Sequence, residues 1–216
     1  FGRALCVGFA RLGAQVWGCD ILPDELAETR QLCGQAGGEC EVRTVDITQV
    51  EAVRAFVDEA NRDRTPVTVL VNNAGGVLGQ VGRPVEDVQP ADWQAIFDVN
   101  VSGAFYMCQG VVPGMKSARR GRIINIASGA GLGVSLTGIQ AYASAKAALV
   151  NLTRQLGHEL GAWNITVNCI APGFVRSNPN TEKQWQSYGA EGQRQLVERI
   201  ALRRLGTPED IAHGTL

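Results

Sequence analysis

The 216-residue chain is predicted to fold as one α/β domain with a doubly wound parallel sheet. Strand-like and helix-like runs alternate from end to end, and the strand-like runs are largely apolar, as in strands covered on both faces. Hydrophobic residues make up 45% of the chain, enough for one core, with neither a linker nor a repeat in the sequence. We therefore expect residues 1–216 to form a single domain.

The strands are predicted from short apolar runs that contain β-branched residues. They cover residues 15–20, 41–45, 67–71, 122–127 and 165–170. Pro172 and Gly173 follow the last run and end it, because both residue types favour turns. The chain starts at Phe1 rather than Met and stops inside a helical pattern, so we expect the first and last strands of the sheet to lie outside the given sequence.

The helices are predicted where apolar residues recur at helical spacing. In order, they begin after Gly2, at Asp24, at Thr48, at Pro90 (running to about Met115), at Gln140 (running to Leu160) and near Leu196. The third start is a capping-box pattern, because a glutamate follows Thr48 three residues later. A polar stretch at 178–193 precedes the last helix.

Composition excludes several classes of protein. Twenty Lys and Arg residues against 21 Asp and Glu give a net charge of −1, which provides no field for a nucleic acid or a membrane surface. The apolar runs are far shorter than the roughly 20 residues that span a bilayer. The six cysteines lack metal-ligand spacing, so we expect no metal site and a reducing, cytoplasmic environment.

The strongest chemical signal is a tyrosine and a lysine four positions apart. Tyr142 and Lys146 share one face of the predicted helix at 140–160. A free tyrosine has a pKa of about 10, and a nearby cation lowers it, so Lys146 is expected to make Tyr142 a general base. Ser128 ends a predicted strand, where parallel sheets place their sites, and supplies a hydroxyl for a substrate oxygen. By itself, such a Tyr/Lys pair also occurs by chance on solvated helices.

Five motifs in order extend this signal over almost the whole chain, which resembles the short-chain dehydrogenase/reductase family. They are Asn72-Asn73-Ala74-Gly75, Asn100 within 98–103, the run from Gly121 to Ser128, Tyr142-x-x-x-Lys146, and Pro172-Gly173-Phe174-Val175. Two features depart from the family's usual pattern: Ala127 stands where a second serine is common, and the spacing from Ser128 to Tyr142 is one residue longer. Five co-ordered motifs are a far more specific signal than Tyr-x-x-x-Lys alone.

The resemblance implies four catalytic residues in a Rossmann-like domain. Tyr142 would exchange a proton with the substrate alcohol or carbonyl while a nicotinamide exchanges the hydride. Lys146 would bind the nicotinamide ribose and lower the pKa of Tyr142. Ser128 would bind the reacting oxygen. Asn100 would hold a water that links Lys146 to solvent.

The resemblance also implies a set of cofactor-binding residues. They are Gly2, Asp20, Asp46, Ile47, Asn73, Ala74, Gly75, Tyr142, Lys146, Pro172, Gly173, Val175 and Ser177. Asp20 ends a strand, where a carboxylate binds the adenosine ribose and repels the 2′-phosphate of NADP, so NAD is expected rather than NADP. For Asp46, capping the helix entered at Thr48 is the competing interpretation.

Substrate and assembly remain open at this point. Residues 174–205 are expected to form a substrate-binding loop and helical insertion within the domain. An uncharged wall (Val77, Leu78, Leu132, Gly133, Val134 and Ile139) favours a neutral secondary alcohol or ketone. Arg176 keeps the alternative of an NADPH-dependent 3-oxoacyl-[acyl-carrier-protein] reductase open. A cofactor-binding protein without turnover is the third reading, and a homotetramer is the expected assembly.

Overall fold

The computed structural model describes residues 1–62, 66–135 and 137–216. Its five strands are all parallel: β1 (Val16–Asp20), β2 (Cys40–Thr44), β3 (Val69–Asn72), β4 (Gly121–Ile126) and β5 (Ile165–Ile170). In the described residues they pair in two groups, β1 with β2, and β3 with β4 and β5 in that order. These are the five predicted strands, with ends shifted by one or two residues.

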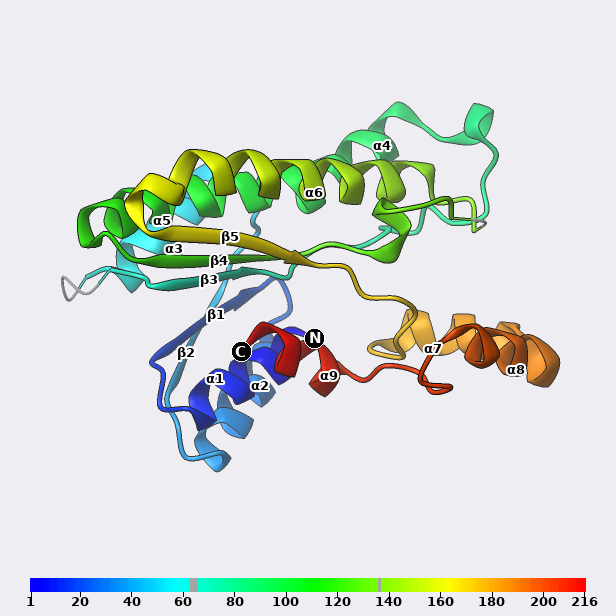
Figure 1. Ribbon diagram of the computed structural model, residues 1–216, viewed down its shortest axis with the longest axis horizontal. Coiled ribbons are helices and arrows are strands. Elements are labelled where there is room, and N and C mark those ends of the chain that lie inside the picture. The colour runs from blue at the N-terminus through cyan, green and yellow to red at the C-terminus, as the bar shows by residue number, and fades with distance from the viewer. Residues whose placement is uncertain (63–65, 136) are drawn as a thin grey trace.

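Helices cover both sides of the strands, as the doubly wound prediction requires (Figure 1). One side carries α3 (Val50–Ala60), α5 (Gly103–Ala118) and α6 (Gln140–Leu160), while α4 (Pro90–Phe97) packs against α6. The other side carries α1 (Gly2–Arg11), α2 (Pro23–Gln35) and α9 (Pro208–Thr215). The insertion at 174–205 contains α7 (Pro179–Ser187) and α8 (Gly189–Arg199), which lie beyond the ends of the strands (Figure 1).

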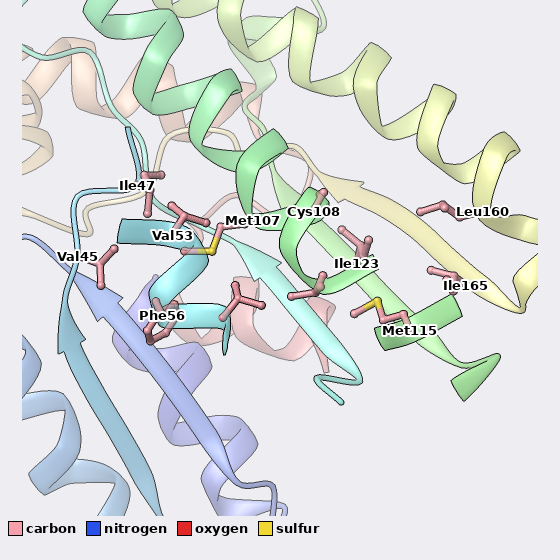
Figure 2. Packing of buried hydrophobic residues seen from close by; sticks show 12 residues of the cluster. Val45, Ile47, Val53, Phe56, Met107, Cys108, Met115, Ile123, Leu160 and Ile165 are labelled. Carbon is pink, nitrogen blue, oxygen red and sulfur yellow. The ribbon is translucent and has the colours of Figure 1, made fainter. Parts of the chain in front are cut away.

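The main core lies between β3, β4 and the helices above them. Figure 2 shows its side chains converging from α3, α5 and β4. The members buried most completely are Val53, Met115, Ile123 and Leu160, each 0% exposed. Val53, Phe56 and Val57 share one face of α3, which is the helical spacing that predicted this element.

Three sequence predictions about helices were wrong. The helix predicted to begin near Leu196 is α8, which begins at Gly189, and the polar stretch at 178–193 contains α7. The capping box at Thr48 does not form in the described residues: α3 begins at Val50, and the Thr48 side chain instead donates to Asp46 at 2.8 Å. The helix predicted from Pro90 to Met115 is divided, because a π-helical turn at Asp98–Ser102 separates α4 from α5. Such turns insert one extra residue and re-aim side chains, and this one contains Asn100.

Three buried polar side chains tie the strand ends to α6. Asn72 Nδ2 donates to Asn125 Oδ1 at 2.8 Å, and Asn125 Nδ2 donates to Thr153 Oγ1 at 2.9 Å. Asn125 is 0% exposed, so water cannot replace either bond. The network holds the carboxyl ends of β3 and β4 level with each other and against α6.

Asn125→Ala is therefore expected to lower the free energy of unfolding by about 2–4 kcal/mol, because it leaves two buried polar groups without their partner. Urea unfolding followed by circular dichroism measures this loss. Asn151→Ala, on the exposed face of α6, is the matched control and is expected to change stability by only a few tenths of a kcal/mol, roughly the difference in helix propensity. Equal effects of the two substitutions would contradict the role assigned to the network.

Candidate active site

The predicted site residues converge on one cavity of about 2440 Å³. It is bounded by the start of α1, by β1 and by the segments that follow β3, β4 and β5, because parallel strands bring their carboxyl ends to the same edge. Thirteen residues from the predicted set line it: Gly2, Asp20, Ile47, Asn73, Ala74, Gly75, Ser128, Tyr142, Lys146, Pro172, Gly173, Val175 and Ser177. Among the described residues, Asn100 and Asp46 are the two predicted positions outside this lining.

Ser128, Tyr142 and Lys146 form a compact group at the end of β4. The Ser128 hydroxyl, which accepts from the Ala130 amide at 3.2 Å, lies next to the Tyr142 phenol, and the Lys146 ammonium lies 5.6 Å from the centre of the Tyr142 ring. Lys146 Nζ donates to the carbonyl oxygen of Ile126 at 2.8 Å and is only 3% exposed. A hydroxyl, a phenol and an ammonium thus meet at the end of β4, where the hydroxyl and the phenol are partly exposed and the ammonium is buried.

Burial shifts both titratable groups away from their charged forms. It raises the pKa of Tyr142 above the usual value, although the hydrogen bond from Ser128 opposes this shift. It lowers the pKa of Lys146 to about 8. We expected Lys146 to lower the pKa of Tyr142, and this expectation was wrong, because the pKa of Tyr142 is raised overall. The loss of hydration of the phenolate outweighs the stabilising contacts. The phenol is therefore protonated at neutral pH.

Asn100 fixes the backbone next to Lys146. Its Nδ2 donates to the carbonyl oxygens of Gly76 and Ile96, each at 2.9 Å, and its Oδ1 accepts from the Gly76 amide at 3.1 Å. A Cβ atom on Gly75 would collide with Asn100 Oδ1 and lie 3.2 Å from Lys146 Nζ. Gly75 also has a φ of 154°, so glycine is required there for both conformation and space. Asn100 is observed in a positioning role, and the water predicted for it stays a prediction.

A second positioning residue, Gln80, was missed in the sequence. It is 1% exposed, and its Nε2 donates to Gly138 O at 2.9 Å and to Gln140 Oε1 at 3.0 Å. These bonds clamp the segment after Gly76 onto the first turn of α6, two residues before Tyr142. The partners are about sixty positions away along the chain, and no local pattern marks the contact.

The far end of the cavity is negative. Asp20 is exposed at the end of β1, and its Oδ1 accepts from the Leu22 amide at 3.2 Å. Arg3 on α1 lines the same cavity, but its guanidinium is bonded to Glu25 at 2.6 Å and to Glu28 at 2.7 Å. This cation is therefore neutralised by two carboxylates.

Asp46 does not cap the helix, as the competing interpretation held, because α3 begins at Val50 without a side-chain cap. Its Oδ1 accepts from the Thr48 amide at 2.9 Å and from the Thr48 hydroxyl at 2.8 Å. The side chain thus stabilises the turn before α3. Its predicted contact with an adenine stays a prediction.

Aromatic side chains from the insertion close the opposite end. Phe174 stacks on Trp185 with ring centres 6.1 Å apart and meets Tyr188 at 5.7 Å. Phe174 and Tyr188 line the cavity together with Val77, Leu78, Val134 and Ile139 from the predicted wall, whereas Leu132 and Gly133 are not part of the lining in the described residues. From the sequence, Phe174 is named only as part of a motif and is not assigned to the cavity wall. Its position directly after the Pro172-Gly173 turn is the signal that could have identified it.

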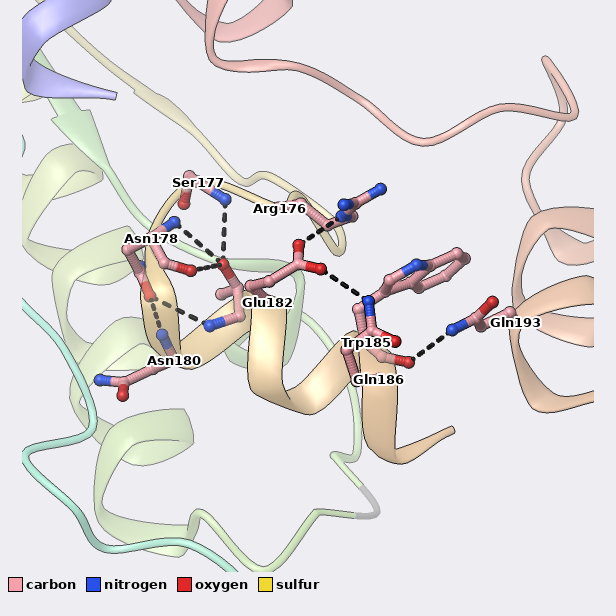
Figure 3. Close-up of polar contacts among 9 residues, drawn as sticks. Arg176, Ser177, Asn178, Asn180, Glu182, Trp185, Gln186 and Gln193 are labelled. Carbon is pink, nitrogen blue, oxygen red and sulfur yellow. Dashed lines mark hydrogen bonds and ion pairs between the residues drawn. The ribbon is translucent and has the colours of Figure 1, made fainter. Parts of the chain in front are cut away.

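Polar contacts hold this insertion in shape (Figure 3). The side chain of Asn178 caps α7 by accepting from the amides of Asn180 and Thr181, both at 3.0 Å. Arg176 donates to Glu182 at 2.7 Å and lies 5.7 Å from the ring of Trp185. The Arg176 charge is thus engaged within the insertion itself.

The lining fits an extended dinucleotide. Gly2 opens α1, whose N-terminus favours phosphate, and a Cβ atom there would come within 2.9 Å of Asn73 Nδ2. A carboxylate suited to a ribose diol stands at one end of the cavity, and the Ser128, Tyr142 and Lys146 group stands at the other. No helix within the described residues is both long and apolar enough to cross a membrane.

Comparison with known proteins agrees with this geometry. A family model described as short chain dehydrogenase matches residues 1–187. The probable galactose dehydrogenase GalD of Rhizobium meliloti is 37% identical over 97% of this chain and 80% of that protein. The 3-oxoacyl-[acyl-carrier-protein] reductase FabG of Chlamydia pneumoniae is 35% identical over 83% of this chain and 69% of that protein. The crystal structure of NAD⁺-bound xylitol dehydrogenase superposes with a TM-score of 0.89 at 29% identity, covering 99% of this chain and 85% of that one.

The buried ammonium predicts a specific dependence of stability on pH. The pKa of Lys146 is about 8 in the folded chain against 10.5 for an ordinary lysine, so between these values the unfolded chain binds more protons and stability rises with pH. Relative to Lys146→Met, the wild-type chain should gain on the order of 2 kcal/mol between pH 7 and pH 9.5. Urea unfolding of both proteins at the two pH values measures this difference. A constant difference would show that Lys146 is not deprotonated in this range.

Proposed function

The chain belongs to the short-chain dehydrogenase family, and from this membership we propose that it is an NAD-dependent oxidoreductase that interconverts a secondary alcohol and a ketone. As a member it is an oxidoreductase of alcohol and carbonyl groups that binds a nicotinamide cofactor. The observation that carries the finer proposal is the adjacent Ser128 and Tyr142 pair beside the buried Lys146.

The proposed roles follow from the protonation states of these side chains. A bound nicotinamide supplies or accepts the hydride. Tyr142, protonated at neutral pH, donates its proton to the carbonyl oxygen during reduction and becomes a phenolate. In the oxidation direction this phenolate form removes the proton from the alcohol and returns to the phenol. Ser128 donates a hydrogen bond to the same oxygen and stabilises the negative charge that develops there. Lys146, held by Ile126 O at 2.8 Å, is placed to donate to the ribose hydroxyls of the cofactor.

The proposed preference for NAD rests on charge at the adenosine end. The Asp20 carboxylate accepts hydrogen bonds from a ribose diol and repels a 2′-phosphate. Arg3 on α1, which lines the same cavity, is bonded to Glu25 and Glu28 and offers that phosphate little attraction. Both observations support NAD over NADP.

The proposed substrate is a neutral alcohol or its ketone, such as a polyol or a modestly hydrophobic carbonyl. Val77, Leu78, Val134 and Ile139 contribute no charge to the cavity. The similarity to a probable galactose dehydrogenase and to a xylitol dehydrogenase supports a polyhydroxylated substrate. Residues 174–205 remain the proposed substrate-binding insertion, because Phe174 and Tyr188 stand in the cavity wall.

A 3-oxoacyl-[acyl-carrier-protein] reductase is the second candidate. The 35% identity to the Chlamydia pneumoniae reductase favours it. An anionic carrier needs a free cation beside the cavity, and Arg176 is bonded to Glu182. This pairing and Asp20 make the NADPH-dependent activity the weaker proposal. A homotetramer stays a prediction, supported by the exposed rings of Trp93 on α4 and Phe105 on α5.

Tyr142→Phe is expected to reduce turnover at least a thousandfold, roughly the contribution of a general acid or base, while NADH binding stays within a few fold of wild type. The phenol hydroxyl acts on the substrate, whereas the aromatic ring only packs, so the substitution removes the proton donor and keeps the packing. Turnover is followed by NADH absorbance over a panel of polyols, hexoses, hydroxysteroids and 3-hydroxyacyl thioesters, and binding by NADH fluorescence. Tyr106→Phe on α5 is the matched control. Activity of Tyr142→Phe within a few fold of wild type would overturn the mechanism.

The wild-type protein is expected to use NAD at least tenfold more efficiently than NADP in kcat/KM, a difference of about 1.4 kcal/mol. Asp20→Asn should lower the ratio of kcat/KM for NAD to kcat/KM for NADP, because it removes the charge that repels the 2′-phosphate. Asp24→Asn, also exposed and near the start of α2, is the control and should leave the ratio unchanged. A preference for NADP in the wild-type protein would show that Asp20 does not face the ribose.

A further inference from the structure

Three cysteines from distant parts of the chain meet beneath the adenosine end of the cavity. Cys6 lies on α1, Cys33 on α2 and Cys40 on β2, and all three pack in one small cluster with Ala10. Cys33 and Cys40 are buried, at 0% and 6% exposed, whereas Cys6 is half-buried and lines the cavity. Cys6 is therefore the member that a small solute in the cavity reaches.

The sulfurs of Cys6 and Cys40 converge on the same point of β1. A Cβ atom on Gly18 would lie 3.6 Å from Cys6 Sγ and 4.0 Å from Cys40 Sγ. Glycine at this position leaves room for the two thiols to meet. The Cys40 thiol itself donates to the carbonyl oxygen of Glu41 at 3.8 Å.

The pKa values of the three thiols shift in different directions. The neighbouring Cys40 thiol lowers the pKa of Cys6 and outweighs the opposing effect of burial, whereas the neighbouring Cys6 thiol raises the pKa of Cys40. Burial raises the pKa of Cys33 to about 11. Thiolates rather than thiols are nucleophiles, so Cys6 is the reactive sulfur and Cys40 its neighbour.

We propose that Cys6 and Cys40 are an oxidant-reactive pair that a hydroperoxide, such as hydrogen peroxide, converts into a disulfide between α1 and β2. The Cys6 thiolate attacks one peroxide oxygen, an S–O bond forms as the O–O bond breaks, and water leaves after protonation. The Cys40 sulfur then attacks Cys6 Sγ, the S–S bond forms as the S–O bond breaks, and the Cys40 proton leaves with the hydroxide as a second water. Two thiols lose two electrons, which reduce one peroxide to two waters.

The other cysteines lack this arrangement. Burial raises the pKa of Cys19 to about 12, and that of Cys108 to about 11. Cys33 is fully buried and does not line the cavity in the described residues. The disulfide would join Cys6 on α1, four residues after Gly2, to Cys40 on β2. It would involve none of the residues placed in catalysis. The proposal stands independently of the proposed function.

Peptide mapping of the reduced protein after treatment with hydrogen peroxide tests the proposal. Trypsin releases Cys6 in fragment 4–11 but leaves Cys33 and Cys40 together in fragment 31–43, so a glutamate-specific protease that cuts after Glu39 is needed to separate them. We expect a Cys6–Cys40 link within one chain, a loss of two hydrogens and reversal by dithiothreitol. A link between Cys33 and Cys40, a link between chains, or prior oxidation of Cys19 or Cys169 would overturn the assignment.

Two substitutions separate the roles of the pair. In Cys40→Ser the sulfenic acid on Cys6 has no resolving thiol, and dimedone should trap it there. In Cys6→Ser the disulfide should be lost and peroxide consumption should fall at least tenfold, whereas Cys169→Ser is the control and should behave as wild type. Should either variant fail to fold, alkylation of the wild-type protein by limiting iodoacetamide decides the matter, since Cys6 should react first and labelling led by another cysteine would refute the proposal.

Discussion

The burial of one ammonium group is the constraint on which the site depends. Lys146 is 3% exposed, and a charge in such a place is unfavourable unless polar atoms replace its water. The carbonyl oxygen of Ile126 does so at 2.8 Å, and that carbonyl is available because β4 ends there. The position of α6 over β4, and therefore that of Tyr142, follows from this contact.

Glycine and asparagine around the ammonium complete this arrangement. Gly131 must lack a side chain because a Cβ atom would lie 2.7 Å from the Ala147 amide nitrogen, and Gly75 is restricted in the same way by Asn100. Asn100 in turn needs the π-helical turn that divides α4 from α5 in order to reach Gly76. A local irregularity in a helix thus sets the backbone beside the charged group.

The two ends of the cavity differ in how they treat charge. At the end that holds Tyr142 and Lys146, burial disfavours the charged forms of both side chains. At the adenosine end, Asp20 keeps an exposed negative charge while Arg3 is neutralised by two glutamates. The two groups, which differ in burial and in charge, thus line one and the same cavity.

The sequence by itself determined the parallel α/β architecture and most of the site, because these depend on local patterns. Apolar runs placed the strands, and the spacing of Tyr142 and Lys146 placed both on one helix face. Only the tertiary structure decided the direction of the pKa shift of Tyr142, the clamp made by Gln80 and the meeting of Cys6 with Cys40. These features depend on burial and on contacts between segments tens of residues apart, and neither is encoded in the periodicity of a single segment.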